Sequence, residues 1–526
     1  MGRVLDLRFP LAGVRRGGSY YLPSQEVYPA PWACNVRSLD PLELRARGGS
    51  RPGLTALGVD FPESSVTGMV SLPVSSADGS ASVLGVVAGG SLGVVVDGVY
   101  SSPVGDLLTV AGETLLTEAG ANLLADTGAV PDSAHLCVRG PKIYAISETG
   151  IVCLDSLTGV VDQVVASRGE IPAGAVAGCF YRDRLVLIGA DNVVYASRQG
   201  DPTDWDYGAD ADDPGRAVAF QLADAQEHGV PPVALMPFED RILFIGAVRS
   251  LWAIHGDPAT GVLRTVSRGV GIVGRTAWCV IQDSRAGDSL AQRGVAFLGD
   301  DGLYMLSPEG AGPVPLSKTV LPQEFRSDSA AVSLVFSPRE RGIYVFLTPA
   351  ASAGLHWFVD LVHGAFWPMR LQRSHQPTVA CLHDGDVVLA GQDGHLRRVG
   401  GETDDGMPIS SHVLFGPLRV GSVGAYGRIL WLVAGMATGS GPVTWRIVVG
   451  QTAEDAARRA KTAVEAFMAG SSYAEFVAMR GDWTAGRSVS VYPHLRAEWC
   501  VIWLESAATW AFESMRVETT ESGRVR

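Results

Sequence analysis

The densest cluster of chemically active side chains in this sequence is RARGGSRPGL, at residues 45–54. It holds Arg45, Arg47 and Arg51 together with adjacent glycines and a proline. Three chemistries suit such a segment. It resembles a glycine-rich loop that binds phosphate, an arginine contact to nucleic-acid phosphates, or a backbone bend whose arginines pair with carboxylates. The choice depends on the charge and fold of the rest of the chain.

The overall charge argues against a protein that grips nucleic acid. The formal net charge is −13, and phosphate binding needs a basic surface. An acidic wall nevertheless lets DNA slide past, because it repels phosphate. Gly48 and Gly49 favour a bend, and Pro52 favours an extended conformation at Arg51. We therefore expect Arg45, Arg47 and Arg51 to contact carboxylates of an adjacent subunit. Contact with DNA phosphate, or exposure without a partner, remain open alternatives.

Two further motifs resemble nucleotide-binding loops. GVGIVG at 269–274 matches the GxGxxG pattern, but the following RTAWCVI is strand-like, whereas pyrophosphate binding needs a helix there. GPVPLSKT at 312–319 lacks a glycine before its lysine, and its two prolines remove backbone donors that phosphate requires. We expect neither segment to bind a nucleotide or another cofactor.

Candidate metal ligands and catalytic groups are scattered. Five of the ten histidines lie within 356–395, at irregular steps: His356, His363, His375, His383 and His395. The loop GDPTDWDYGADADDPG at 200–215 holds six aspartates but lacks the residue order of a calcium-binding EF-hand loop. No serine lies in a GxSxG elbow. We expect no enzyme activity and no metal site. A histidine metal site and a calcium loop are the alternatives.

Composition indicates an all-β chain of several domains. With 526 residues, the chain exceeds the size of one ordinary hydrophobic core, so two to four domains are expected. Glycine accounts for 63 residues and is spread through short apolar runs. This pattern predicts many tight turns between short strands.

A repeated hairpin pattern indicates the architecture. YRDRLVLIGADNVVYASRQGDP at 181–202 and FEDRILFIGAVRSLWAIHGDP at 238–258 align with one inserted residue, and weaker copies recur about every 50 residues. The repeat predicts a β-propeller of about six to eight blades, with Tyr195 and Trp252 buried at equivalent positions. A β-solenoid or two sandwiches are the alternatives.

The chain divides into three predicted parts. Residues 1–60 are expected to form an extended N-terminal arm that contacts a neighbouring subunit, and residues 61–400 the propeller. Beyond the polar boundary GGETDDGMPISS, residues 401–526 are expected to form a β-rich, sandwich-like domain. Its one helix is predicted at 453–468, where Ala453, Ala457, Ala460 and Val464 share a face and Thr452 is the N-cap.

The chain is expected to be a soluble protein without disulfides. Its seven cysteines show no CxxC pair and lie mostly in apolar runs, which is typical of small buried side chains. The N-terminus has no secretion signal. The most apolar window, 82–100, is broken by central glycines and predicts two strands around a turn rather than a membrane span.

Several segments resemble a known family. The opening LAGVRRGGSYYLPSQEVYPAPWACNVRSLDPLELRARGGSRPGL is similar to the N-terminal region of bacteriophage virion β-propeller proteins, most specifically over Asn35–Leu54. YASRQGDPTDWDYG, WAIHGDPATG and LGDDGLYMLSPEG resemble propeller segments of the same proteins. The nearest class is the tail nozzle, or tail tubular B-type, protein of short-tailed phages.

The resemblance implies a structural protein of the virion, made in the host cytoplasm. Such proteins form a hexameric ring at the nozzle or neck of the tail. The ring joins an adaptor ring and other tail proteins, including fibres, and genomic DNA passes through it without specific binding. No catalytic residue and no cofactor carries over. A propeller-based enzyme acting on glycans, or a monomeric propeller scaffold for other proteins, are the alternative functions.

Overall fold

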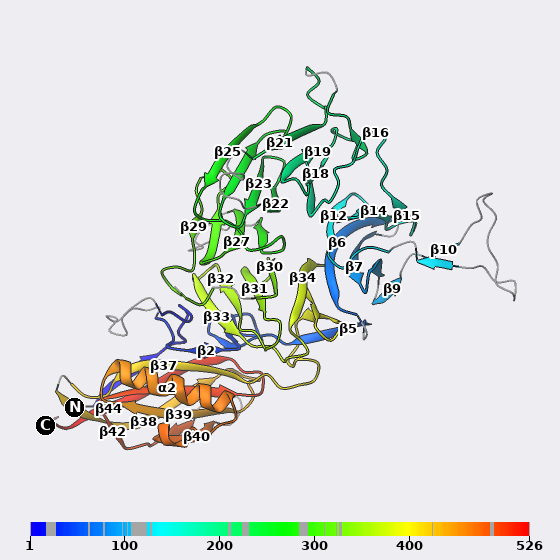
Figure 1. Cartoon of the computed structure of the whole chain (residues 1–526). Coiled ribbons are helices and arrows are strands. Elements are labelled where there is room, and N and C mark those ends of the chain that lie inside the picture. Colours follow the sequence, from blue (N-terminus) through cyan, green and yellow to red (C-terminus); the bar gives the residue numbers. More distant parts are fainter. Residues whose placement is uncertain are drawn as a thin grey trace, which may run out of the picture.

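The computed structural model describes most of the chain. The described residues are 2–16, 28–61, 64–76, 79–96, 98–101, 104–106, 124–126, 129–208, 212–222, 231–282, 293–309, 311–321, 323–325, 329–422, 424–483 and 489–524. They form a ring of β-sheets and a separate β-sandwich that carries a helix on one face (Figure 1).

Seven four-stranded antiparallel sheets form the ring, which confirms the predicted propeller. The first sheet contains β6 (Val66–Ser76), β7 (Gly79–Ala88), β8 (Ser91–Val96) and β9 (Val99–Ser101). The second contains β12 (His135–Arg139), β13 (Lys142–Ser147), β14 (Gly150–Asp155) and β15 (Val161–Gln163). The third contains β17 (Ala177–Tyr181), β18 (Arg184–Ile188), β19 (Val193–Ala196) and β21 (Val218–Gln221).

The other sheets follow in chain order. The fourth contains β22 (Pro232–Phe238), β23 (Ile242–Ala247), β24 (Leu251–His255) and β25 (Val262–Ser267). The fifth contains β26 (Trp278–Ile281), β27 (Gly294–Gly299), β28 (Gly302–Leu306) and β29 (Val314–Pro315). The sixth contains β30 (Ala331–Ser337), β31 (Gly342–Thr348), β32 (His356–Asp360) and β33 (Ala365–Met369). Short pairs join β10 (Val104–Asp106) to β11 (Leu124–Asp126) and β16 (Arg168–Gly169) to β20 (Asp204–Trp205).

The seventh sheet closes the ring with strands from both ends of the propeller. It contains β34 (Pro377–His383), β35 (Asp386–Gly391) and β36 (His395–Val399), and its fourth strand is β5 (Leu54–Asp60). The register pairs Arg397 with Ala56 and Val399 with Leu54. Because β5 precedes the first sheet in sequence, this pairing ties the first and last sheets together.

Apolar clusters fill the spaces between neighbouring sheets. Most strands in the ring are buried on both faces, as in β27, whose six residues are all buried. One cluster joins the third and fourth sheets, and others join the first to the second, the second to the third and the seventh to the first. A propeller sheet cannot bury both faces alone, so stacking around the ring supplies the cover that these sequences require.

The aligned repeat occupies equivalent hairpins in the third and fourth sheets. Tyr195 pairs with Leu187, and Trp252 pairs with Ile245. Both aromatic residues therefore lie on the third strand of their sheets, as predicted. Trp252 is buried, whereas Tyr195 is half-buried, so the predicted burial is right for Trp252 alone.

The sequence alignment of this repeat is shifted by one residue in its first strand. Arg184 is the first residue of β18, and its structural equivalent is Ile242 rather than Arg241. The turn before β18 contains Arg182 and Asp183, both with positive φ, whereas the turn before β23 is one residue longer. A longer turn after β18 restores the register of Tyr195. The two differences in turn length cancel, so the sequences align without a gap between Tyr181 and Tyr195 although their first strands are shifted.

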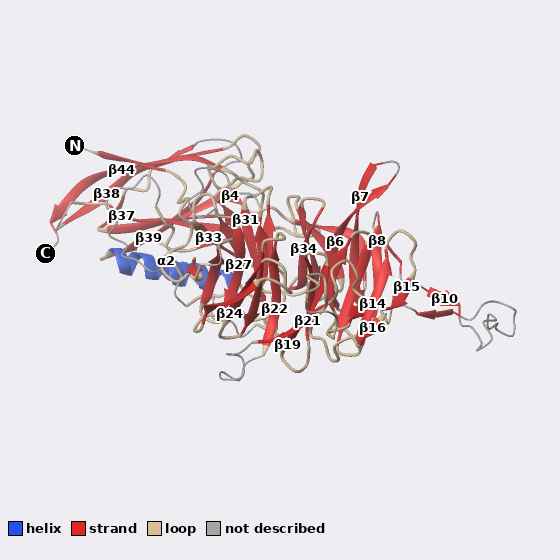
Figure 2. Cartoon of the chain, turned by 90° about the horizontal axis from the view of Figure 1, so that it is seen from above, coloured by secondary structure: helices blue, strands red, loops and turns tan. Residues whose placement is uncertain are grey.

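The C-terminal domain is a sandwich of two five-stranded sheets (Figure 2). One sheet contains β1 (Arg3–Leu7), β44 (Phe512–Arg524), β38 (Ala425–Met436), β41 (Val489–Val491) and β42 (Leu495–Ala497). The other contains β2 (Ala33–Cys34), β37 (Ser411–Arg419), β43 (Trp499–Ser506), β39 (Val443–Gly450) and β40 (Met479–Trp483). Phe415 of one sheet packs on Phe512 of the other, with ring centroids 5.2 Å apart.

The predicted helix is confirmed as α2 (Ala453–Met468). Thr452 is its N-cap and accepts a hydrogen bond from the Asp455 backbone N–H at 3.0 Å. The small-residue face is buried and contacts β37, β39 and β43: Ala453, Ala456, Ala457, Ala460, Ala463 and Val464. A short 3-10 helix, η1 (Ala474–Phe476), follows.

We expect Ala457→Leu to destabilise the protein by about 1–3 kcal/mol, because the added carbons must fit a face that is already closed against the sheet. Urea denaturation followed by circular dichroism measures this. Arg458→Leu is the matched control, since the Arg458 side chain is 73% exposed and its substitution should change stability by less than about 0.5 kcal/mol. Equal effects of the two substitutions would show that the alanine face is open.

The N-terminal residues do not form the predicted extended arm. β1 and β2 are strands of the sandwich, β5 is a strand of the propeller, and β3 (Val36–Arg37) pairs with β4 (Gly49–Ser50) between them. Residues 33–38 and 49–51 are buried, because this segment fills the junction between the two domains. The predicted extended arm was wrong, because the glycines and proline of this segment form a bend packed between the two domains rather than an exposed linker.

Cysteines and the apolar window are placed as follows. All seven cysteines are free thiols, six of them buried and Cys381 half-buried. The window 82–100 contributes β7, β8 and part of β9, which confirms strands around turns. Among the described residues, no helix has the length and apolar character needed to cross a membrane.

Candidate functional site

The segment Asn35–Leu54 lies at the junction between the propeller and the sandwich. Its backbone bonds to both domains: the Asn35 N–H donates to Pro368 of the sixth sheet, and the Ser50 N–H donates to Trp510 of the sandwich. Leu54 then starts β5. The segment with the densest cluster of chemically active side chains therefore connects the two domains, and we call it the joint.

Arg51 uses all of its donors inside the chain. Its Nη1 and Nη2 donate to the Asp404 carboxylate at 2.9 and 2.5 Å, and its Nε donates to Asn35 Oδ1 at 3.0 Å. Nη1 and Nη2 also donate to the backbone oxygens of Pro52 and Arg370. The residue is only 2% exposed. Arg51 therefore has no donor left for a neighbouring subunit, and the sequence prediction does not hold for this side chain.

Arg47 is bound by three carboxylates of its own chain. It contacts Asp40 at 3.0 Å, Glu43 at 3.1 Å and Glu513 of the sandwich at 2.7 Å. Asp40 is fully buried and also accepts the backbone N–H groups of Leu42, Glu43 and Arg45, which fixes the turn before Arg47. The predicted pairing of Arg47 with carboxylates is right, but the carboxylates belong to the same chain.

Arg45 is the exposed member of the three. Its side chain is 57% exposed and contacts Glu43 at 3.3 Å and Glu513 at 4.0 Å. Exposed ion pairs of this kind contribute little to the stability of the folded protein. Of the three predicted inter-subunit residues, Arg45 alone presents its charge at the surface.

Close backbone approach explains the glycines of the segment. Gly48 has φ +79°, and a Cβ there would lie 2.1 Å from the Phe9 ring. A Cβ on Gly53 would lie 2.1 Å from the Thr403 carbonyl oxygen. Because a Cβ at either position would overlap its neighbour, only glycine fits at both.

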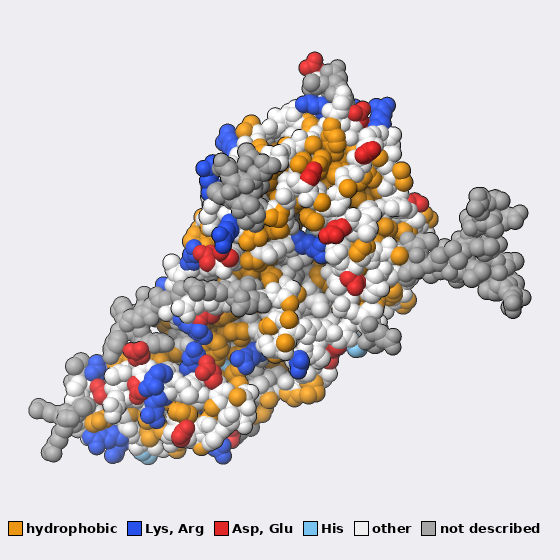
Figure 3. Space-filling model, viewed as in Figure 1, with side chains coloured by type: hydrophobic (Ala, Val, Ile, Leu, Met, Phe, Trp, Pro, Cys, Tyr) orange, Lys and Arg blue, Asp and Glu red, His pale blue; other side chains and the backbone are white. Residues whose placement is uncertain are grey.

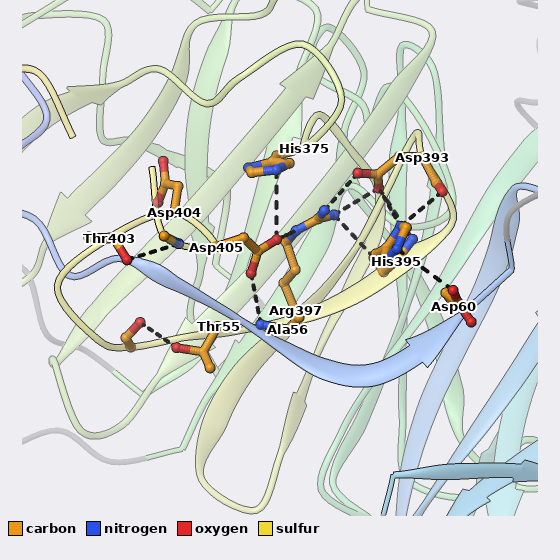
Figure 4. A network of polar contacts seen from close by, with 12 residues as sticks. Thr55, Ala56, Asp60, His375, Asp393, His395, Arg397, Thr403, Asp404 and Asp405 are labelled. Carbon is orange, nitrogen blue, oxygen red and sulfur yellow. Dashed lines mark hydrogen bonds and ion pairs between the residues drawn. The ribbon is translucent and has the colours of Figure 1, made fainter. Parts of the chain in front are cut away.

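A second arginine network closes the propeller beside this joint (Figure 4). Arg397 on β36 contacts Asp393 at 2.6 Å and Asp405 at 2.5 Å, and Asp405 accepts the backbone N–H of Ala56 on β5. Burial alone would raise the pKa of Asp393, but its hydrogen bonds with Arg397 and the His395 backbone hold the pKa below the usual value. One guanidinium thus holds two carboxylates, and through Asp405 it ties β36 to β5.

One serine–histidine–aspartate arrangement was not foreseen from the sequence. Ser71 Oγ lies 2.9 Å from His383 Nδ1, and Asp384 lies 3.6 Å from His383 Nε2, beside a cavity of about 350 Å³. A catalytic triad requires a carboxylate hydrogen-bonded to the second ring nitrogen, and 3.6 Å is too long. The Asp384 carboxylate instead accepts the Ser82 hydroxyl. The arrangement therefore lacks the geometry of an activated nucleophile.

A groove of about 610 Å³ lies between the second sheet and the loop that follows β19. Polar side chains of the second sheet and of the loop beyond β19 line it: Arg139, Lys142, Tyr144, Asp162, Gln163 and Thr203. Glycosidases need a pair of carboxyl groups. Asp162 is the single carboxylate among the described residues that line this groove, so it offers no such pair.

The remaining candidate segments are structural where the structure describes them. GVGIVG at 269–274 connects β25 to β26 without a helix, and GPVPLSKT contributes β29. His356 is fully buried with its Nδ1 bonded to the Leu347 N–H, and burial lowers its pKa to about 4. Within the described residues, no three His, Cys, Asp or Glu side chains converge as metal ligands. Part of the acidic loop, 209–211, lies outside the described residues.

Neither a protein-family model nor a curated protein matches the sequence. Among solved structures, BamB from Moraxella catarrhalis is similar over 66% of this chain and 97% of its own, with 11% identity and a TM-score of 0.34. The N-terminal domain of Nup159 is similar over 67% and 95%, with 12% identity and a TM-score of 0.35. The extracellular domain of a putative one-component system from B. thetaiotaomicron covers 75% and 45%, with 11% identity and a TM-score of 0.41. No function follows from similarities this low.

Proposed function

We propose that this chain is a structural component of a bacteriophage tail. It forms a hexameric ring around the DNA exit channel, at the nozzle or neck, and binds an adaptor ring and other tail proteins. One observation carries the proposal. The Asn35–Leu54 segment, through which the chain most resembles phage nozzle proteins, is the joint that holds the propeller and the sandwich together. A rigid two-domain unit suits a part that transmits load and performs no chemistry.

The distribution of charge supports assembly into a ring. Residues 61–400 contain 22 Lys and Arg against 37 Asp and Glu, a net charge of −15, whereas the rest of the chain carries +2. In a ring, each subunit presents one surface to the next and a different surface to the previous one. An acidic propeller beside a nearly neutral sandwich provides two surfaces of different charge.

Arg428 and Arg496 are the candidate basic contact on the sandwich. They face each other directly across β38 and β42, and both are exposed. Like charges directly opposite one another destabilise a sheet. Among the described residues no carboxylate forms an ion pair with either arginine. Figure 3 shows Lys and Arg side chains gathered at this end of the sandwich. Carboxylates from the propeller of a second copy would relieve the repulsion.

Light scattering and negative-stain electron microscopy of the purified full chain test the proposal. We expect rings at low salt. The double variant Arg428→Glu/Arg496→Glu should shift the protein toward monomers, while Arg480→Glu on the other sheet leaves the rings intact. Rings formed by the double variant would contradict the proposed contact at Arg428 and Arg496 but would still support the proposed ring. A strictly monomeric wild-type protein, alone and with its adaptor ring, would contradict the ring itself.

We expect duplex DNA to bind only weakly, at about micromolar Kd or weaker at physiological salt. A tail conduit must release DNA, and each arginine–phosphate contact would retard it. Fluorescence anisotropy with labelled duplex over a salt series measures this. Tight binding with a steep loss of affinity as salt rises would mean that arginines line the DNA path. Arg45, the exposed arginine of the segment, would then be assigned to DNA contact rather than to a subunit contact.

A further inference from the structure

Arg275 is a half-buried arginine in the loop that leads into β26, the inner strand of the fifth sheet. Its Nη1 donates to the backbone oxygen of Ser133 at 2.5 Å and lies 3.5 Å from that of Val176. Ser133 precedes β12 of the second sheet, and Val176 precedes β17 of the third. One side chain of the fifth sheet thus reaches two sheets that are not its neighbours.

The order of the sheets requires this contact to cross the centre of the ring. The fifth sheet packs on the sixth through β26 and β30, and on the fourth through β27 and β22. The inner strand β12 packs instead on β6 and β17. Two sheets separate the fifth from the second on one side and three on the other. Because the sheets of a propeller surround a central channel, the Arg275 side chain spans that channel.

The contact lies at one mouth of the channel. Arg275, Ser133 and Val176 are each within three residues of the first residue of an inner strand. Every sheet of the ring runs from its inner strand outward in the same antiparallel order, so the inner strands all start at the same mouth. The side chain therefore bridges this mouth rather than the middle of the channel.

The loop that carries Arg275 is held in place. Trp278 Nε1 donates to the backbone oxygen of Arg275 at 2.8 Å, and Thr276 Oγ1 donates to that of Val332 in the sixth sheet at 2.6 Å. The Ala277 N–H donates to the Gly274 oxygen and closes a turn. With its backbone fixed, only the side chain of Arg275 needs to move for the bridge to open.

The charge of Arg275 acts across the channel rather than within its own sheet. None of the described carboxylates forms an ion pair with it, and its acceptors are neutral backbone oxygens. Burial, together with the nearby Arg275 charge, lowers the pKa of His135, the first residue of β12, to about 4. A hydrogen bond from a charged donor contributes more than one between neutral groups. The bridge is therefore a single strong contact.

We propose that Arg275 is a latch that closes this mouth of the central channel and braces the ring across its width. The pairing of β5 with β36 closes the ring along its circumference, and Arg275 ties it across the centre. While the side chain bridges the mouth, it blocks entry to the channel from this side. The latch lies inside one chain, so it does not depend on the ring of subunits proposed above.

Hydrogen exchange of the full chain, followed by mass spectrometry, tests the latch. Arg275→Met removes the donors and keeps an unbranched apolar side chain. We expect exchange in β12 and β17 to rise about tenfold or more, as for the loss of one hydrogen bond from a charged donor. Exchange in β22 and β30, which flank the fifth sheet, should stay unchanged. Arg275→Lys should restore part of the protection, because an ammonium also donates to carbonyl oxygens.

Arg249→Met is the matched control, because Arg249 is exposed in the turn between β23 and β24. Its exchange should equal that of the wild type. Unchanged exchange in Arg275→Met, or a rise confined to the fifth sheet and its two neighbours, would overturn the latch. If Arg275→Met does not fold, a crystal structure of the wild-type protein decides. Density that joins Arg275 to Ser133 supports the proposal, and a side chain turned toward solvent overturns it.

Discussion

Replacing Arg51 with alanine is expected to destabilise the protein by about 3–5 kcal/mol. The substitution leaves the Asp404 carboxylate, which is 4% exposed, as a buried charge without its partner. It also removes a donor from Asn35, whose Oδ1 is then left with the Arg370 N–H alone. Removing one member of a buried, hydrogen-bonded pair costs far more than the pair itself contributes, because the remaining charge stays desolvated.

Arg45→Ala is the matched control, six residues away in the same segment. The Arg45 side chain is 57% exposed, and its ion pairs are screened by water, so the expected change is below about 0.5 kcal/mol. Arg51→Lys should resemble Arg51→Ala more than wild type, because one ammonium cannot reproduce a bidentate contact. Urea denaturation gives all three values. Similar losses for Arg45→Ala and Arg51→Ala would show that the Arg51 network does not hold the joint.

The chemistry of the arginine segment could be predicted from sequence, but its partners could not. Arginines flanked by glycines and a proline indicated carboxylate pairing at a bend, and the structure shows such pairs for Arg47 and Arg51. The main partner of Arg51, Asp404, lies 353 positions away. Nothing in the local pattern distinguishes a carboxylate of the same chain from one of a neighbour. Whether the arginine is buried decides which carboxylate it meets, and burial depends on the whole fold.

The fold itself was predictable to the level of the hairpin repeat. Recurring apolar strands with glycine turns specify sheets that need cover on both faces, and a ring supplies that cover. The seven sheets lie within the predicted range of six to eight. The closing strand β5 gave no such signal, because LTALGVD carries glycine and exposed residues and shows no hairpin partner in its own vicinity. Its partner β36 is known only once the ring closes.

Arg37 shows a different limit of sequence reasoning. It stands outside the arginine cluster at 45–51, and one arginine in ACNVRSLD gives no sign of burial without a carboxylate. The aromatic rings that hold it come from β31 and β32, about 300 residues further along the chain.

The second large effect is expected at Trp252. Trp252→Ala should cost about 3–5 kcal/mol, because the indole is 2% exposed and belongs to the apolar cluster between the third and fourth sheets. Tyr195→Ala tests the equivalent position one sheet earlier. Tyr195 is half-buried and its hydroxyl bonds to Asp191, so part of its surface already contacts water, and a loss of about 1–2 kcal/mol is expected.

Urea denaturation of both variants, followed by far-UV circular dichroism, measures the difference. The comparison separates position from burial, since the two residues occupy the same register in neighbouring sheets. A larger loss for Tyr195→Ala would mean that its packing against the second sheet contributes more to stability than the burial of Trp252 between the third and fourth sheets. A larger loss for Trp252→Ala is the result that its deeper burial requires, because propeller sheets are stabilised mainly by the apolar area that they bury against their neighbours.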